Sequence, residues 1–130
     1  RNGDLLRPIL AEFRQAGIRT SVFMECQEDR IRAAADLGAD RIELYTEGYA
    51  VGYASDPLAA VTPYVHAAQW AKSVGLGVNA GHDLSSENLQ FFAQHMPGLD
   101  EVSIGHALIS EALYLGLENT VQRYRHLLER

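Results

Sequence analysis

Two histidines follow glycines at the ends of predicted strands, where a parallel α/β sheet places its chemistry. His82 follows Gly81 in the stretch Val-Asn-Ala-Gly-His-Asp-Leu, and His106 follows Gly105 in the stretch Val-Ser-Ile-Gly-His-Ala. A helical run comes after each histidine, so helix N-termini with free backbone N–H groups open beside two imidazoles. This repeated pattern favours the binding of a phosphorylated substrate.

The hydrophobic pattern places these histidines in a regular alternation of helices and strands. Apolar residues at helical spacing, with N-cap residues and closing glycines, predict helices over 4–15, 29–37, 57–74, 87–95, 107–115 and 117–129. Short apolar runs between them predict strands over 18–24, 41–45, 76–79 and 101–104. Residues 46–55 contain Gly48 and Gly52, and we expect them to form the longest loop.

Four strand–helix units imply a parallel sheet, because successive parallel strands need crossover helices. Glu43, Asn79 and Ser103 interrupt the strands with polar groups, which the central strands of a doubly wound sheet seldom carry. The carboxyl-terminal mouth of a TIM (β/α)8 barrel would accommodate the Glu43 carboxylate, and such a barrel needs about eight strands to close. The sequence therefore predicts an α/β fold in which residues 1–130 form half of a single TIM-barrel domain.

Composition excludes several classes of partner. The 130 residues are 47% apolar and 22% charged, which is ordinary for one globular domain. A formal charge of −6 with scattered basic residues argues against nucleic-acid binding, and no apolar stretch reaches the roughly 18 residues of a membrane span. Cys26 is the single cysteine and cannot form an internal disulfide. We expect a cytoplasmic protein.

Several motifs in this order make the sequence similar to a known family. They lie at residues 16–23, 38–44, 48–50, 78–84 and 104–107 and extend over essentially the whole chain. The chain resembles the C-terminal half of the pyridoxine 5'-phosphate synthase family of vitamin B6 biosynthesis. The resemblance implies strands five to eight of a TIM barrel, the last four βα units, with a short extra helix after the last strand.

The activity of that family is implied with the resemblance. Its members condense 3-amino-2-oxopropyl phosphate with 1-deoxy-D-xylulose 5-phosphate, release phosphate and water, and close a pyridine ring. They need no metal or organic cofactor, and they assemble as homo-oligomers, octamers built from dimers. The ring closure requires several proton transfers, a role that histidine can fill near neutral pH.

The resemblance also assigns roles to five residues of this chain. His82 matches the proton-donor histidine, and Glu43 matches the glutamate that stabilises charged intermediates. Asp83, Gly105 and His106 match positions that bind the aminoketone phosphate. Because a carboxylate repels phosphate, we expect the Asp83 side chain to turn away and cap the next helix. The remaining acid–base groups lie in the other half of the family's barrel, so we expect an isolated 130-residue piece to be inactive.

Two other functions and three simpler residue roles remain open at this point. Glu43 and His82 could be ligands in a metal-dependent sugar-phosphate isomerase barrel, although no recognisable metal-ligand spacing occurs. The chain could also be a phosphate-binding fragment without catalysis. Individually, His82 could be a turn residue, His106 could act only through its backbone, and Glu43 could form a structural ion pair with an arginine such as Arg41.

Overall fold

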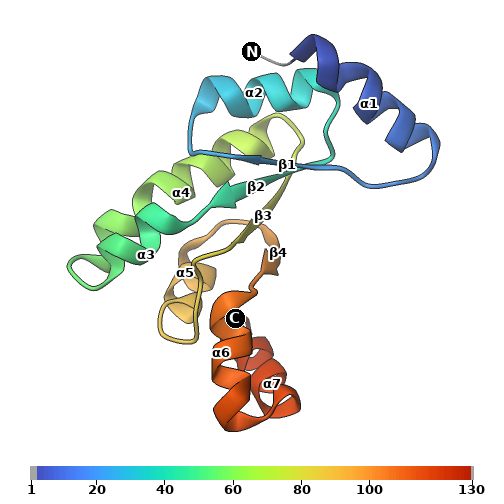
Figure 1. The fold of residues 1–130 in the computed structure, drawn as a ribbon. Coiled ribbons are helices and arrows are strands. Elements are labelled where there is room, and N and C mark those ends of the chain that lie inside the picture. Colours follow the sequence, from blue (N-terminus) through green and yellow to red (C-terminus); the bar gives the residue numbers. More distant parts are fainter. Residues whose placement is uncertain (1–2, 130) are drawn as a thin grey trace.

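The predicted parallel α/β sheet is confirmed by the computed structural model, which describes residues 3–129. Every strand pairs in parallel with its neighbour in the sequence, so the strand order is β1-β2-β3-β4 (Figure 1). The four strands are β1 (Ser21–Met24), β2 (Arg41–Tyr45), β3 (Gly77–Gly81) and β4 (Leu99–Ser103). The strand order therefore never reverses along the sheet.

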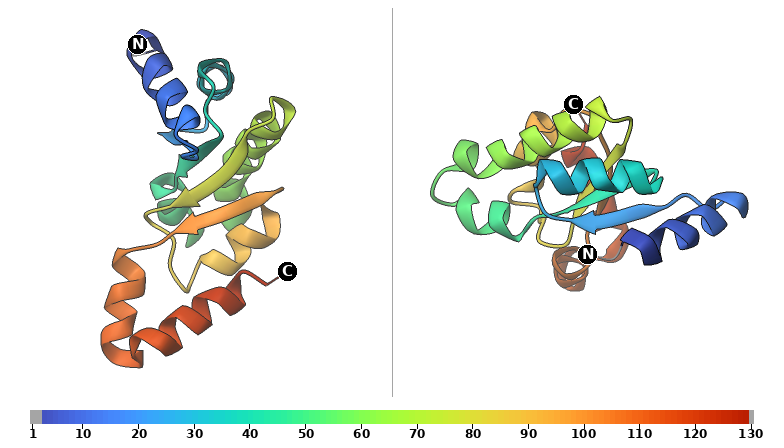
Figure 2. Two further views of the ribbon diagram at one scale, coloured as in Figure 1. Left: turned by 90° about the vertical axis from the view of Figure 1, so that its right-hand side faces the viewer. Right: turned by 90° about the horizontal axis from the view of Figure 1, so that it is seen from above.

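The helices lie on one face of this sheet and at its two ends (Figures 1 and 2). Connections between parallel strands are almost always right-handed, so an unreversed strand order keeps successive crossover helices on one face. Those helices are α2 (Glu28–Leu37), α4 (Pro57–Ser73) and α5 (Leu89–His95). At the ends lie α1 (Gly3–Gln15), beyond β1, and the pair α6 (His106–Leu115) and α7 (Leu117–Leu127), beyond β4.

Local signals in the sequence explain where several of these helices begin and end. The Asp56 side chain accepts a hydrogen bond from the Ala59 amide at 3.0 Å, and Pro57 occupies the first turn of α4. Gly38 ends α2 in the left-handed conformation, with φ of 88°. Gly116 separates α6 from α7, as predicted.

The core forms between the sheet and the helices on its covered face. Ile42 and Leu44 of β2 and Val78 and Ala80 of β3 are fully buried there. Because successive strand residues point to opposite faces, the residues between them lie on the other face, which none of the helices within residues 3–129 covers. That open face carries mainly polar and aromatic side chains, among them Phe23, Arg41, Glu43, Tyr45 and Asn79.

The open face is concave. The side chains of Arg19, just before β1, and Glu101 of β4 approach to 2.8 Å although β1 and β4 are opposite edges of the sheet. Three strand spacings separate these edges, about 14 Å in a flat sheet. The Arg41 side chain also reaches across β3 to Glu101, at 3.1 Å, and a Cβ at Gly77 would lie 2.8 Å from Cγ of Arg41. The sheet therefore curves towards its open face.

The predicted loop over residues 46–55 is wrong. It contains a further helix, α3 (Glu47–Tyr53), which packs against α4. Gly48 and Gly52 suggested a loop, but they allow close packing: a Cβ at Gly52 would lie 3.0 Å from Cβ of Ala60. Similarly, α5 begins at Leu89 rather than near residue 87, because the preceding residues form a turn. Tertiary packing here outweighs local propensity.

The helices within residues 3–129 are all too short or too polar to cross a membrane.

Candidate active site

The polar side chains of the open face lie in register across the sheet. Phe23, Glu43, Asn79 and Glu101 lie side by side on the four strands. Two residues further along each strand, Tyr45 lies opposite Gly81, and Gly81 lies opposite Ser103. Since the strands are parallel, their carboxyl ends meet at one edge, and the residues that follow the strands gather there.

A cavity of about 530 Å³ lies at this carboxyl-terminal edge, on the open face. It brings together four of the five predicted site residues: Glu43, His82, Gly105 and His106. The rest of its lining is Phe23, Ser103 and Ile104, none of which was predicted to belong to the site. Their positions on the strands of the same open face are the signal that could have identified Phe23 and Ser103.

Glu43 projects into this cavity from the middle of β2. Among the described residues it has no hydrogen-bond or ion-pair partner, and Arg41 instead binds Asn79 Oδ1 at 3.0 Å and Glu101 at 3.1 Å. The structural ion pair between Glu43 and Arg41 is therefore not formed. The Glu43 carboxylate remains available for a ligand.

His82 has an unusual backbone conformation. Its φ is 76°, the left-handed region that a residue with a Cβ seldom adopts, and it is the one such non-glycine residue between residues 3 and 129. Its amide donates to the Ser103 carbonyl at 2.9 Å, which ties the end of β3 to β4. Strained backbone of this kind concentrates at functional sites. The imidazole is 64% exposed, and its ring centre lies 5.8 Å from that of Tyr45.

Asp83 does not line the cavity, and its carboxylate contacts His82 instead. Asp83 Oδ2 lies 3.1 Å from His82 Nδ1. The expectation that this side chain caps the next helix is wrong, because α5 has Asn88 as its N-cap, and the Asn88 side chain accepts from the Ser85 amide. The Asp83 carboxylate turns towards the chain's own histidine.

Thr46 joins the ends of β2 and β3 beneath the site. Its buried hydroxyl donates to the Gly81 carbonyl and accepts from the Asp83 amide at 3.2 Å. Sequence reasoning did not assign this role, although Thr46 follows β2 as His82 follows β3. The hydroxyl fixes the turn that carries His82.

Gly105 and His106 form the start of α6. Gly105 is its N-cap, and its carbonyl accepts from the Ile109 amide at 3.0 Å. The first N–H groups of a helix have no partner within the helix and carry the positive end of its dipole. Both residues are exposed and line the cavity, so this end of α6 can receive an anion.

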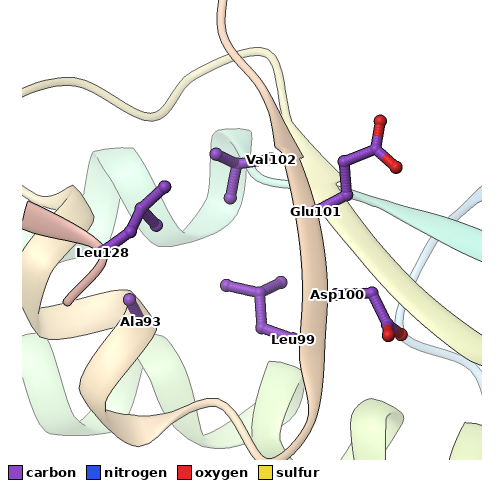
Figure 3. Close-up of a pocket in the computed structure, with 6 residues that line it drawn as sticks. All are labelled: Ala93, Leu99, Asp100, Glu101, Val102 and Leu128. Atoms are coloured by element: carbon purple, nitrogen blue, oxygen red, sulfur yellow. The ribbon is translucent and has the colours of Figure 1, made fainter. Parts of the chain in front are cut away.

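Two further cavities carry less chemistry. One of about 530 Å³ lies beside α3 and α4 and includes Cys26. Burial, with the Glu25 carboxylate adding to it, raises the pKa of the Cys26 thiol to about 12, so this thiol is a poor nucleophile at neutral pH. A second, of about 250 Å³, lies behind the edge strand β4. The side chains of Ala93, Leu99, Val102 and Leu128 face it, while Asp100 and Glu101 also line it but direct their carboxylates away (Figure 3).

The histidines outside the cavity lie on helix surfaces. His66, His95 and His126 are all exposed. Between residues 3 and 129 no group of three or more histidine, cysteine and acidic residues is arranged to hold a metal ion.

Fold and site together define an α/β protein whose ionisable groups meet at the carboxyl ends of parallel strands. The family model described as "Pyridoxal phosphate biosynthesis protein PdxJ" matches residues 1–130, and the chain belongs to this family. It is 59% identical over 127 residues to pyridoxine 5'-phosphate synthase of Bacteroides fragilis, covering 98% of this chain and 54% of that protein. It is 58% identical over 125 residues to the synthase of Porphyromonas gingivalis, covering 96% and 52%. The chain thus spans about half the length of the curated relatives it matches.

Proposed function

We propose that residues 1–130 form the C-terminal half of a TIM barrel that synthesises pyridoxine 5'-phosphate. The substrates are 3-amino-2-oxopropyl phosphate and 1-deoxy-D-xylulose 5-phosphate, and the enzyme acts in the cytoplasm as a homo-oligomer. One observation carries this proposal: Glu43 and His82 line a single cavity with Gly105, in a chain that belongs to the PdxJ family.

The shape of the sheet supports half of a barrel rather than a complete open sheet. Its strand order is unreversed, its helices cover one face, and its polar face is concave. Apolar side chains remain uncovered at both ends: Leu5 is 65% exposed on α1, and Leu117 is 58% exposed on α7. The recess behind β4, lined by Ala93, Leu99, Val102 and Leu128 among others (Figure 3), lies beside the edge strand to which a further strand would pair. Four more βα units would pair both edge strands and enclose the cavity.

The two ionisable side chains in the cavity suit a condensation with loss of water. His82 protonates a departing hydroxyl as a general acid, and histidine does this well near neutral pH. Glu43, which has no hydrogen-bond or ion-pair partner within residues 3–129, places a negative charge where positive charge develops on a substrate nitrogen. The other acid and base come from the half of the barrel outside this chain, so these 130 residues alone are inactive.

The phosphate of the aminoketone binds at the start of α6. Amide groups beginning near Gly105 and His106 supply donors and a positive dipole, which compensates for the few basic residues of the chain. Asp83 belongs to the same site, but its amide already donates to Thr46 Oγ1 and to the Gly81 carbonyl. Its contribution therefore passes through His82.

Replacing His82 in the full-length enzyme tests the proposal. With His82→Asn we expect turnover to fall by a factor of about 10² to 10⁴, the usual contribution of a general acid, while the protein stays folded. Glu43→Gln should lower turnover without preventing phosphate binding. His66→Asn, a change at an exposed histidine on α4, is the matched control and should leave turnover unchanged. Near-normal turnover of His82→Asn would remove His82 from its assigned role.

A further inference from the structure

Asp83 and His82 form a carboxylate–imidazole pair at the rim of the cavity. Asp83 Oδ2 lies 3.1 Å from His82 Nδ1, and the two side chains differ in exposure, 28% for Asp83 and 64% for His82. The imidazole lines the cavity, whereas the carboxylate lies outside its lining. The carboxylate therefore approaches the imidazole from the side of the protein.

Three hydrogen bonds hold the Asp83 backbone in place. Its amide donates to Thr46 Oγ1 at 3.2 Å and to the Gly81 carbonyl at 3.2 Å, and its carbonyl accepts from Asn88 Nδ2 at 3.3 Å. Thr46 and Asn88 are buried, so these contacts connect Asp83 to the core. Asp83 is therefore the less exposed of the two side chains and has an anchored backbone, which favours a contact in which the carboxylate orients the imidazole.

A carboxylate in this position decides which ring nitrogen carries the proton. An ionised carboxylate only accepts hydrogen bonds, so Nδ1 must carry a hydrogen whenever the pair is formed. Nε2 is then the nitrogen left to exchange a proton with a ligand in the cavity. A carboxylate that orients a histidine in this way is known to be important for acid–base chemistry in other enzymes.

We propose that Asp83 is a positioning residue, which holds the His82 imidazole with Nδ1 protonated and Nε2 turned to the substrate. This role rests on the proposed function of His82 as proton donor: the donating form is the imidazolium, with a proton on each nitrogen, and the neutral ring protonated on Nδ1 is what remains after Nε2 has given up its proton. The positioning role also explains why a carboxylate can lie close to the proposed phosphate site: the Asp83 carboxylate contacts the imidazole and not the phosphate of the substrate.

The tautomer of His82 tests this proposal independently of turnover. We suggest ¹⁵N nuclear magnetic resonance of the imidazole in the full-length protein at about pH 8.5, some two units above the ordinary titration of histidine. In the wild-type protein the neutral ring should carry its proton mainly on Nδ1. In Asp83→Asn the amide can offer an N–H to Nδ1, and the Nε2-protonated form should rise several-fold. Asp83→Glu, which restores a carboxylate, should recover the Nδ1-protonated form at least in part.

The chain offers a matched control on α7. His126 Nδ1 lies 2.9 Å from Glu129 Oε2, the same type of pair, but both side chains are more than 70% exposed and neither lines the cavity. Glu129→Gln should leave both the His82 tautomer and turnover unchanged. Asp83→Asn should instead lower kcat more than it raises KM, because the substrate does not contact Asp83.

The outcomes separate this proposal from the proposed function. A wild-type His82 protonated mainly on Nε2, or a tautomer that does not respond to Asp83→Asn, would overturn the positioning role whatever the turnover. A tautomer that shifts as expected in a protein without synthase activity would support the positioning role and contradict the proposed function. Loss of turnover without a tautomer shift would mean that Asp83 contacts the substrate, which also overturns the positioning role.

Discussion

Arg19 and Glu101 lie at opposite edges of the four-stranded sheet, yet Nη2 of Arg19 and Oε2 of Glu101 are 2.8 Å apart. The same Glu101 oxygen lies 3.1 Å from Nη1 of Arg41, whose side chain is only 20% exposed. One carboxylate of β4 therefore binds an arginine before β1 and an arginine of β2. This network crosses the concave face from the amino-terminal ends of β1 and β2 to the middle of β4, and none of its three residues lines the cavity that contains His82.

Removal of the Glu101 carboxylate should destabilise the fold more than removal of a carboxylate from an ordinary surface pair. Glu101→Ala breaks two ion pairs and leaves the half-buried Arg41 without its acidic partner, so we expect the free energy of unfolding to fall by about 1–2 kcal/mol. Glu28→Ala removes one exposed pair with Arg32 on α2 and should cost about 0.5 kcal/mol or less. Urea unfolding measures both values, and equal losses would contradict a stabilising role for the network.

Gly81 should tolerate no side chain, because β3 and β4 approach closely at the site. A Cβ at Gly81 would lie 2.2 Å from the Ser103 carbonyl oxygen, which is backbone and cannot move freely. We expect Gly81→Ala to destabilise the protein by about 3 kcal/mol. At Gly105 a Cβ would meet nothing within 4 Å, and Gly105→Ala should change stability by less than about 0.5 kcal/mol. Thermal unfolding of the two variants makes the comparison, and similar midpoints would refute it.

The Tyr64 hydroxyl should stabilise the junction between α3, α4 and β2. It accepts from the Tyr49 amide at 3.1 Å and donates to the Tyr45 carbonyl at 3.0 Å. Tyr64→Phe leaves both groups without this partner in a buried place and should cost about 2 kcal/mol. Tyr114 is 90% exposed, and Tyr114→Phe serves as the control with no expected change. Denaturant titration would contradict the prediction if both variants matched the wild type.

Asp40 should make the fold sensitive to acid. The amide and the hydroxyl of Thr20 donate to its carboxylate at 2.7 and 2.9 Å, and these bonds lower the pKa of Asp40 in the folded protein. A lowered folded-state pKa contributes stability that is complete above the unfolded value, about 3.9 for aspartate, and is lost as the pH falls through the folded value. Asp40→Asn should therefore be less stable at pH 7 and lose less stability on acidification.

The measurement for Asp40 is the free energy of unfolding at neutral pH and at about pH 3, below the ordinary aspartate value. Parallel curves for the wild type and Asp40→Asn would show that this carboxylate contributes nothing to the acid dependence.

Most of the fold could be predicted because its signals are local. The strand over Arg41–Tyr45 was predicted with its observed bounds, and Asp56 and Gly38 mark helix ends through capping and a left-handed turn. The prediction was wrong where distant packing decides. Gly48 and Gly52 are typical of a loop, but α4 packs against them so closely that residues 47–53 form a helix.

The site residues, too, could be predicted from the sequence only where the signal is local. His82 and Gly105 could be identified because each follows a short strand, and parallel strands bring their carboxyl ends to one edge. Spacing could not indicate the contact of Asp83 with His82 or the role of Thr46 between two strands. It also could not indicate that the Glu43 carboxylate has no partner among residues 3–129. Each depends on side-chain directions and on distances between segments that are far apart in the chain.

The amino-acid sequence by itself determined the alternation of strands and helices, the parallel class of the sheet and the two glycine–histidine strand ends, since periodicity, capping and turn chemistry act over a few residues. Only the tertiary structure decided the curvature that joins Arg19 to Glu101 and the partner of each ionisable group. Crossover connections and packing set those distances, and no local pattern encodes them.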